Sequence, residues 1–338
     1  MRGALAERYR FWDRRECPDA YRNMEILETD PAQLASEVDA VISALPSSVA
    51  HDVEPALREH GVHVFSNASA FRWQQNIPLM LPAVNPEALE LLQKQDTPGV
   101  QVNNPNCTTA GFVPLLQRIR QYGVGIEHVD VVTLQSISGK GDRVVEPDYA
   151  ERIHGNAIDD WGQDGNNSNG EERKSETEPQ KILGTAQERE AVLDAYQQLR
   201  AGEGPQNSTD LVPVTARTNR IPSQYGHLET VSIELDRSMQ VNHFRKMLAS
   251  DDCPERIKRL PSTPDRQIVV QDSVEPAEDV MQQEGMAVTA GRIRRTGEKR
   301  FSMFSLSHNL RLGATWTARH SLELYLQQHH GFFSSQNV

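Results

Sequence analysis

Short apolar strands alternate with helical segments in the first third of the chain. The apolar and β-branched runs predict strands at Val38–Ala44, Val62–Ser66 and Ile77–Leu81, and the helical spacings predict helices over 47–60 and 86–95. Strands that alternate with helices are connected by crossovers rather than hairpins. This order therefore predicts a parallel sheet with helices on both faces.

A cysteine follows the next strand of this series. The run 99–103 predicts a short strand, and apolar residues such as Leu115 and Ile119 then recur at helical spacing until Gly123. Cys107 is therefore expected at a strand-to-helix junction, near unpaired backbone N–H groups and the positive end of a helix dipole. That environment favours the thiolate, which is the reactive form of cysteine.

Two interpretations of Cys107 stay open at this point. As a nucleophile it would attack a carbonyl carbon, and the Asn106 amide with nearby N–H groups would hold the charge that develops on the oxygen. As a structural residue it would be a small hydrophobic side chain at a buried helix start.

The second half of the chain has a different order. Strands are predicted at 129–136, 227–234, 267–270, 286–293 and 301–306. The polar segment 161–178 is predicted to be a surface excursion, followed by a helix over 181–201. A helical pattern over 309–327 closes the series. This half is typical of an α+β domain.

Charge and cysteine usage exclude several classes of protein. The net charge of −12 argues against nucleic acid as a partner, because phosphate backbones repel an acidic surface. No apolar run reaches the roughly 20 residues of a membrane span, and the N-terminus has no apolar core of a targeting peptide. Cys17, Cys107 and Cys253 are scattered and form no CxxC pair, which predicts a reduced, cytoplasmic setting and no metal cluster.

Eight short motifs occur in an order that resembles one enzyme family. They are Ser43–Ser47, Ser66–Ser69, Pro78–Asn85, Asn104–Thr109, Gln135–Gly139, Glu178–Gly184, Asn219–Pro222 with Gly226-His227, and Asn309–Arg311. Over residues 20 to 325 the chain resembles aspartate-semialdehyde dehydrogenase of the archaeal and fungal type. The resemblance implies an NADP-binding Rossmann-like domain over 1–105, a catalytic and dimerisation domain over 106–306, and a C-terminal helix within 307–338 that returns to the first domain.

The resemblance also implies residue roles. Cys107 becomes the nucleophile and His227 the acid/base. The substrate and phosphate sites are assigned to Arg220, Gln135, Glu171, Lys174 and Asn106. The NADP site is assigned to Ser43, Leu45, Pro46, Ser66, Asn67, Ser138, Gly139 and Asn309.

The implied reaction interconverts L-4-aspartyl phosphate and L-aspartate 4-semialdehyde through a cysteine thioester, in the route to lysine, threonine and methionine. A small-molecule substrate, phosphate and copies of the same chain, as a homodimer or homotetramer, are the implied partners. One alternative is a related malonyl-CoA reductase. Another is an inactive remnant that serves only as an interaction module.

One departure from the family concerns the cofactor. Nicotinamide-binding domains of this type begin with a strand, a glycine-rich turn and a helix. Here Gly3 and Gly61 are the only glycines among the first 90 residues, so the first domain is expected to be N-terminally truncated. A late start assignment and a truncated gene are competing explanations, and either predicts poor NADP binding by the 338-residue chain.

Overall fold

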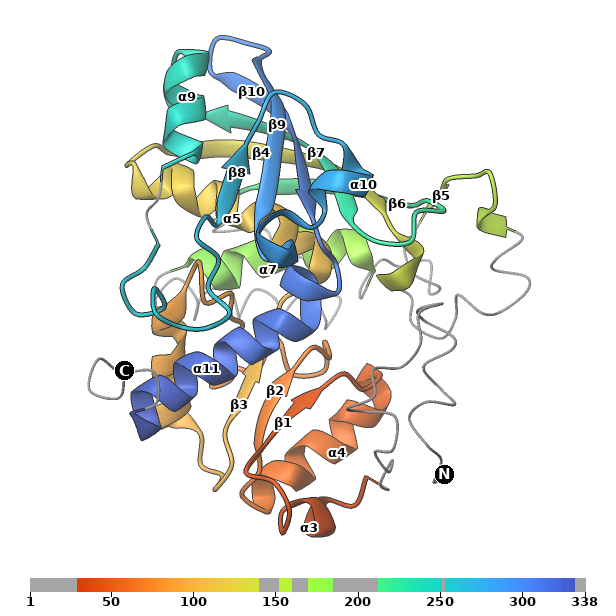
Figure 1. The fold of residues 1–338 in the computed structure, drawn as a ribbon, viewed down its shortest axis with the longest axis vertical. Helices are drawn as coiled ribbons and strands as arrows, with labels where there is room; N and C mark the ends of the chain where they lie inside the picture. Colours follow the sequence, from red (N-terminus) through yellow and green to blue (C-terminus); the bar gives the residue numbers. More distant parts are fainter. Residues whose placement is uncertain (1–28, 140–151, 160–169, 185–211, 251–252, 332–338) are drawn as a thin grey trace, which may run out of the picture.

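Two β-sheets organise the molecule, one below and one above a layer of helices in Figure 1. The computed structural model describes residues 29–139, 152–159, 170–184, 212–250 and 253–331. The predicted α/β class is confirmed. The predicted domain bounds 1–105, 106–306 and 307–338 stay predictions.

The first sheet is parallel, as expected from the alternation of strands and helices. Its described strands run in the order β1 (Ala40–Ser43), β2 (His63–Ser66) and β3 (Gln101–Asn103). Helices α3 (Pro31–Leu34) and α4 (Ser47–Glu59) accompany it. The register pairs Ser43 with Ser66 and Ser66 with Asn103, so these three residues form a row at the carboxyl edge.

The strand predicted at 77–81 is wrong in extent. Only a single parallel bridge joins Leu79 to Asn103. The side chain of Asn85 forms hydrogen bonds with two backbone groups that a neighbouring strand would otherwise pair. Its Oδ1 accepts from Leu81 N at 2.9 Å, and its Nδ2 donates to Leu79 O at 3.0 Å. The helix that follows is the 3₁₀ helix η1 (Pro86–Lys94).

The second sheet is mixed, with strand order β5-β6-β4-β7-β10-β9-β8. Its strands are β4 (Ile126–Gln135), β5 (Ile158–Asp159), β6 (Val214–Arg220), β7 (His227–Leu235), β8 (Ile268–Val270), β9 (Val288–Arg295) and β10 (Arg300–Ser307). Helices α10 (Pro276–Asp279) and η3 (Gln282–Gly285) lie between β8 and β9 in the chain. Sequence reasoning missed β6 because Ala216, Thr218 and Arg220, its buried side chains, are small or polar.

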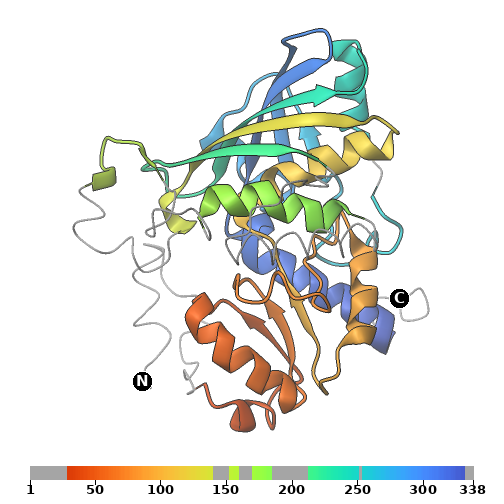
Figure 2. The same cartoon turned by 180° about the vertical axis from the view of Figure 1, so that it is seen from behind.

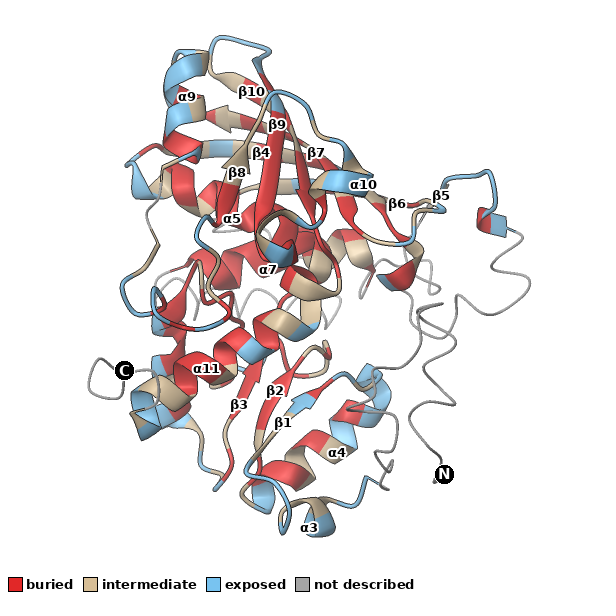
Figure 3. Ribbon diagram, in the orientation of Figure 1, coloured by how far each residue is buried: buried red, intermediate tan, exposed pale blue. Residues whose placement is uncertain are grey.

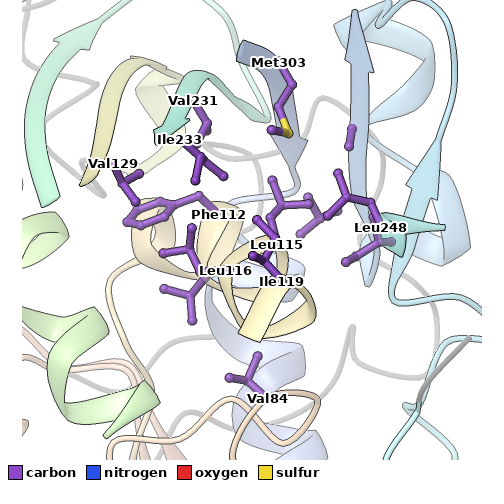
Figure 4. Packing of buried hydrophobic residues seen from close by; sticks show 14 of the residues in the cluster. Val84, Phe112, Leu115, Leu116, Ile119, Val129, Val231, Ile233, Leu248 and Met303 are labelled. Carbon is purple, nitrogen blue, oxygen red and sulfur yellow. The ribbon is translucent and has the colours of Figure 1, made fainter. Parts of the chain in front are cut away.

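Helices α5 (Cys107–Gln121) and α9 (Val241–Leu248) pack against this sheet. Figure 4 shows Phe112 of α5 beside Val129 and Ile233 of the strands, and Leu116 and Ile119 of the same helix belong to the same core cluster. As predicted, α5 ends just before Gly123, whose φ of +66° closes the helix without a Cβ penalty.

The segment 161–178 was predicted to be a surface excursion, and its described part is instead helical. Helix α7 (Glu171–Leu183) packs against β6 and α5, and Figure 3 shows it largely buried between the sheets. Hydrophilic residues such as Glu178 and Lys181 are buried there because hydrogen bonds satisfy them. The helix predicted over 181–201 is described only up to Leu183; the remainder lies outside the described residues.

The chain returns to the first sheet at its C-terminal end. The π-helix η4 (Arg311–Thr315) leads into α11 (Trp316–His330), which crosses beside β2 and β3 in Figures 1 and 2. Leu324 and Tyr325 share a core cluster with Phe65 and Val102. The regular helix begins later than the predicted residue 309 because Ala314 has a non-helical backbone. In the described parts of the chain, no helix has the length and apolarity that membrane spanning requires.

Candidate active site

Cys107 is the first residue of α5, at the junction with β3. The side chain of Asn106 caps this helix by accepting a hydrogen bond from Thr108 N at 3.0 Å. The backbone N–H of Asn106 in turn donates to Oε2 of Glu178 at 2.6 Å. The junction is therefore held from two sides, and the position of the sulfur is defined.

His227 brings an imidazole to the sulfur from the start of β7. Its Nε2 lies 3.1 Å from Sγ of Cys107, and its side chain is fully buried. The other ring nitrogen, Nδ1, accepts from Ser136 N at 3.1 Å. The predicted nucleophile and the predicted acid/base, which are 120 residues apart in sequence, thus meet at hydrogen-bond distance.

Burial sets the protonation of this pair. Desolvation, with a contribution from Glu171, raises the pKa of Cys107 to about 12, although Arg220, Lys174 and Arg72 act in the opposite direction. Desolvation, with a contribution from Arg220, lowers the pKa of His227 to about 3. The resting pair is a thiol and a neutral imidazole. The expectation that the helix start favours the thiolate is wrong for the free protein, because loss of water outweighs the helix dipole.

Arg220 and Gln135 lie side by side at the ends of β6 and β4, where the register pairs them. Nη1 of Arg220 donates to Ser136 O at 2.6 Å, and Nε2 of Gln135 donates to Oγ1 of Thr108 at 2.8 Å. The exposed Gly139 lies over this group, and a Cβ there would approach Nη1 of Arg220 to 2.9 Å. A side chain at this position would therefore collide with the guanidinium of Arg220.

Glu171 and Lys174 lie on one face of α7, as their spacing predicted. Nζ of Lys174 is 2.9 Å from Oε1 of Glu171, and Oε2 of Glu171 accepts from Nδ2 of Asn106 at 2.7 Å. Burial lowers the pKa of Lys174, but the charge and hydrogen bond of Glu171, together with the charge of Glu178, give a net upward shift. Lys174 therefore remains a cation beside Cys107.

Sequence reasoning missed two charged residues of this site. Nη1 of Arg72 donates to Oε1 of Glu178 at 2.8 Å, and the charge of Arg72 acts on the Cys107 thiol. Lys181 holds the same loop by donating to the carbonyl oxygens of Arg72, Gln74 and Ile77 at 2.6–2.9 Å. A signal existed, since Glu178 and Lys181 belong to a recognised motif and Arg72 follows another closely.

Two of the predicted cofactor residues have a different contact. The hydroxyls of Ser43 and Ser66 donate to Oε1 of Glu54 at 2.6 and 2.5 Å, and Gln101 Nε2 donates to Oε2 at 2.7 Å. Glu54 of α4 thereby ties the carboxyl ends of β1 and β2 to the first residue of β3. Both residues are buried, and their backbone carbonyls also accept hydrogen bonds, Ser43 O from Asn67 N and Ser66 O from Asn104 N.

The other predicted cofactor residues divide into two groups. Leu45 and Pro46 form a partly exposed turn after β1, and Asn67 braces it by donating from Nδ2 to Ser43 O at 3.0 Å. Ser138 and Asn309 lie beside His227 instead, where Nδ2 of Asn309 donates to Oγ of Ser138 at 2.9 Å. In the part of the chain that the structure describes, no cluster of His, Cys, Asp and Glu is arranged to bind a metal ion.

Comparison with known proteins gives matches along most of the chain. Residues 6–92 match the family described as semialdehyde dehydrogenase, NAD binding domain, and residues 116–312 match its dimerisation domain. Aspartate-semialdehyde dehydrogenase of Archaeoglobus fulgidus is 34% identical over 321 residues, which are 93% of this chain and 84% of that protein. The crystal structure of aspartate semialdehyde dehydrogenase with NADP from Candida albicans matches with a TM-score of 0.74 and 28% identity, covering 93% of this chain and 84% of that chain.

A more distant match concerns a different reaction. Malonyl CoA reductase (NADP) of Metallosphaera sedula is 26% identical over 330 residues, which are 92% of this chain and 82% of that protein.

Proposed function

Because the chain belongs to the semialdehyde dehydrogenase family, we propose that it interconverts L-aspartate 4-semialdehyde and L-4-aspartyl phosphate, with NADP as the hydride acceptor. In cells this reaction would serve lysine, threonine and methionine biosynthesis in the cytoplasm. The observation that carries the proposal is the 3.1 Å contact between Sγ of Cys107 and Nε2 of His227 at a helix start.

Cys107 is the proposed nucleophile because hydride can leave only from a tetrahedral carbon. The sulfur forms a C–S bond with the aldehyde carbon, and the charge on oxygen collapses as hydride departs, which leaves a thioester. A phosphate oxygen then attacks the thioester carbon, and the C–S bond breaks to release the acyl phosphate. His227 stabilises negative charge that develops on the Cys107 sulfur, because its Nε2 lies within hydrogen-bond distance of that sulfur.

The charged groups around the Cys107 sulfur are opposite in sign to the charged groups of the proposed substrates. We assign Arg220 to the α-carboxylate, which a planar guanidinium binds through two hydrogen bonds, and Glu171 to the amine. Lys174 and Arg72 are assigned to phosphate, since both cations act on the Cys107 sulfur. Gln135 and Asn106 are assigned to the carbonyl oxygen, because both contact Thr108 next to the nucleophile.

The first sheet offers a place for the cofactor. Helix α4 begins at Ser47 without a side-chain cap, and the turn before it lies at the carboxyl end of parallel strands, where nucleotides bind in open α/β sheets. An uncapped helix start and an exposed turn fit an anionic cofactor group. Leu45, Pro46 and Asn67 would hold it through backbone and amide contacts, and the nicotinamide would supply the hydride acceptor. Ser138, Gly139 and Asn309 would face its reactive end, because they lie beside His227.

The family of the second domain supports an oligomer, and we propose a homodimer or homotetramer built through the open face of the seven-stranded sheet. On β4 of this face, Val132 is 44% exposed, which is unusual for a large apolar side chain in a strand. Burial of this face in a second copy of the chain would remove it from water.

The test measures reduction of NADP by the purified chain with L-aspartate 4-semialdehyde, with and without phosphate. We expect turnover that requires phosphate and that Cys107→Ser abolishes, whereas the matched variant Cys253→Ser, which changes a second partly buried cysteine, retains it. Reduction of malonyl-CoA without any phosphate requirement would instead favour the malonyl-CoA reductase reaction. Absence of both reactions in a folded, NADP-binding protein would favour an interaction module.

A further inference from the structure

Four polar side chains form a layer between the seven-stranded sheet and the first turns of α5. Glu229 of β7 lies in register opposite Thr133 of β4 and Ser305 of β10, and Ser307 lies two residues further along β10. All four are buried, on the sheet face against which α5 packs. These four residues are here called the polar layer.

The polar layer has few hydrogen bonds of its own. Oγ of Ser305 donates to Gly111 O at 2.7 Å. Both carboxyl oxygens of Glu229, Oγ1 of Thr133 and Oγ of Ser307 are buried and have no hydrogen-bond partner among the described residues. Native proteins seldom leave buried polar groups unpaired, because the hydrogen bonds with water that are lost on folding must be replaced. Such atoms gathered in one layer indicate a shared partner.

Gly111 of α5 shows how close two of these oxygens lie. A Cβ on Gly111 would be 2.6 Å from Oε1 of Glu229 and 2.8 Å from Oγ of Ser307. The two oxygens therefore approach the same point beside α5 without a hydrogen bond between them. Thr133 is paired with Glu229 in the sheet, where the Cβ atoms of paired residues are about 4.5–5.5 Å apart. A small molecule that both donates and accepts hydrogen bonds can contact all three side chains.

We propose that the polar layer binds at least one internal water molecule, which is held by a protonated Glu229 together with Ser307 and Thr133. Water fits because buried waters typically form about three hydrogen bonds with otherwise unpaired buried groups. A protonated carboxyl group supplies one donor and keeps acceptors, so it can bind water in either role. A metal ion does not fit, since no group of three His, Cys, Asp or Glu side chains in the described residues surrounds this point.

The surroundings of Glu229 favour its protonated form. Burial raises the pKa of Glu229 well above its ordinary value of 4.5. In the sheet, the nearest ionisable side chain along β7 is that of His227, two residues earlier; in α5 it is that of Cys107, one turn before Gly111. A buried carboxylate without a paired cation is costly, so the carboxyl group takes up a proton on folding. This state belongs to the folded chain and does not depend on the proposed function.

Infrared spectroscopy of the full chain without substrate tests the protonation. A protonated carboxyl group has a C=O stretching band that is separate from the bands of a carboxylate. We expect such a band at pH 8 and expect Glu229→Gln to remove it, because glutamine keeps the shape of the side chain without the acid. Glu54→Gln is the matched control at another buried glutamate, which accepts three hydrogen bonds, and should leave the Glu229 band in place. If Glu229→Gln removes no acid band, the proposal is overturned.

Urea unfolding detects the same proton independently. In the unfolded chain Glu229 is ionised above its ordinary pKa of 4.5, so the wild type releases one proton when it unfolds. We expect the unfolding constant of the wild type, divided by that of Glu229→Gln, to rise about tenfold per pH unit between pH 6 and pH 8. A ratio that does not change with pH would mean that Glu229 is ionised in the folded chain, which contradicts the proposal.

A crystal structure of the full chain at a resolution that shows ordered solvent locates the water. We expect a solvent peak within hydrogen-bond distance of a carboxyl oxygen of Glu229 and of Oγ of Ser307. A carboxyl group bonded directly to Ser307 or Thr133, with no solvent peak beside it, would overturn the water site even if Glu229 is protonated. A peak with the short distances and ligand number of a metal ion would overturn it as well.

Discussion

Two strand-to-helix junctions in this molecule share the same local design and differ in burial. β1 ends at Ser43 and α4 begins at Ser47; β3 ends at Asn103 and α5 begins at Cys107. The spacing is the same in both, and each junction contains a proline. In a parallel sheet such junctions lie at the same carboxyl edge, where ligands bind near the N-termini of the helices.

The two junctions differ in exposure and in side-chain capping of the helix, and these differences determine what each junction can do. The β1–α4 junction is exposed at Ser47 and has no side-chain cap, so its backbone N–H groups are accessible to a large anionic ligand. The β3–α5 junction is buried and capped by Asn106, which leaves only the Cys107 sulfur to act. The exposed β1–α4 junction, here called the open junction, can bind a ligand. The buried β3–α5 junction, here called the closed junction, orients the Cys107 sulfur.

Each junction is also fixed by one buried glutamate. Glu54 accepts from three neutral side chains behind the β1–α4 junction. Glu178 binds the N–H of Asn106 and the guanidinium of Arg72 at the β3–α5 junction. Glu178 combines charge pairing with positioning of the proposed nucleophile, so its loss should cost more stability than the loss of Glu54.

Glu178→Gln should have the largest effect. It breaks a buried ion pair, which typically costs about 3–5 kcal/mol of unfolding free energy, and it loosens the residue before Cys107. Urea unfolding and the rate of Cys107 alkylation at pH 8 measure the two effects. Glu54→Gln is the matched variant at the other junction, with an expected cost of about 1–3 kcal/mol and unchanged alkylation. Equal alkylation rates in both variants would contradict the special role of Glu178.

Gly313→Ala should act on the closed junction alone. A Cβ at Gly313 would lie 2.7 Å from Cβ and 3.0 Å from Cα of Cys107, so the start of α5 must shift. We expect a loss of about 1–3 kcal/mol from overpacking and a fall in turnover of about 100-fold from a displaced nucleophile. Gly297→Ala, in an exposed turn where the nearest atom would be 3.3 Å away, is the control. Turnover equal to that of the control would refute the tight contact.

Acid should destabilise the protein through His227. Its pKa of about 3 in the folded state is below the ordinary 6.5, so the unfolded state takes up the proton first. The stability it contributes is complete above pH 6.5 and is lost as pH falls toward 3, with about 1.4 kcal/mol gone at pH 5.5. Urea unfolding at pH 7.5 and 5.5 should show a smaller difference in His227→Gln than in wild type. His51→Gln, which changes a 73% exposed side chain on α4, should not reduce it.

Sequence patterns predicted the elements whose burial follows from apolar periodicity. The strands β1, β2 and β7 and the helices α4 and α5 were found with small errors in their ends, as was Cys107 at its junction. The contact between Cys107 and His227 was expected only through the family resemblance. No local pattern encodes it, because the register of β7 against β4 sets the position of the imidazole.

Elements stabilised by polar contacts were missed or misread. The part of helix α7 up to Glu178 was predicted to be solvated surface because it is rich in charged residues, and only tertiary partners account for the burial of Glu172 and Glu178. Asn85 replaces sheet pairing in the segment that was predicted to be a strand. The protonation of Cys107 was misjudged for the same reason, since desolvation depends on the whole fold and a helix start does not reveal it.

Ser47→Glu should have the smallest effect on stability and an opposite effect on function. A carboxylate in the first turn of α4 interacts favourably with the helix dipole, so we expect a gain of about 0.3–1 kcal/mol in urea unfolding. The same charge repels an anionic cofactor group at the open junction; one added repulsion of about 1 kcal/mol at 4 Å in water should raise KM for NADP about fivefold. Ser47→Gln, which loses the same contact with Ser69 but adds no charge, is the control. Because the junction is exposed, salt should reduce the difference between the two variants. Equal KM values for NADP at low salt would mean that the open junction does not bind the cofactor phosphates, and the functional distinction between the two junctions would then fail.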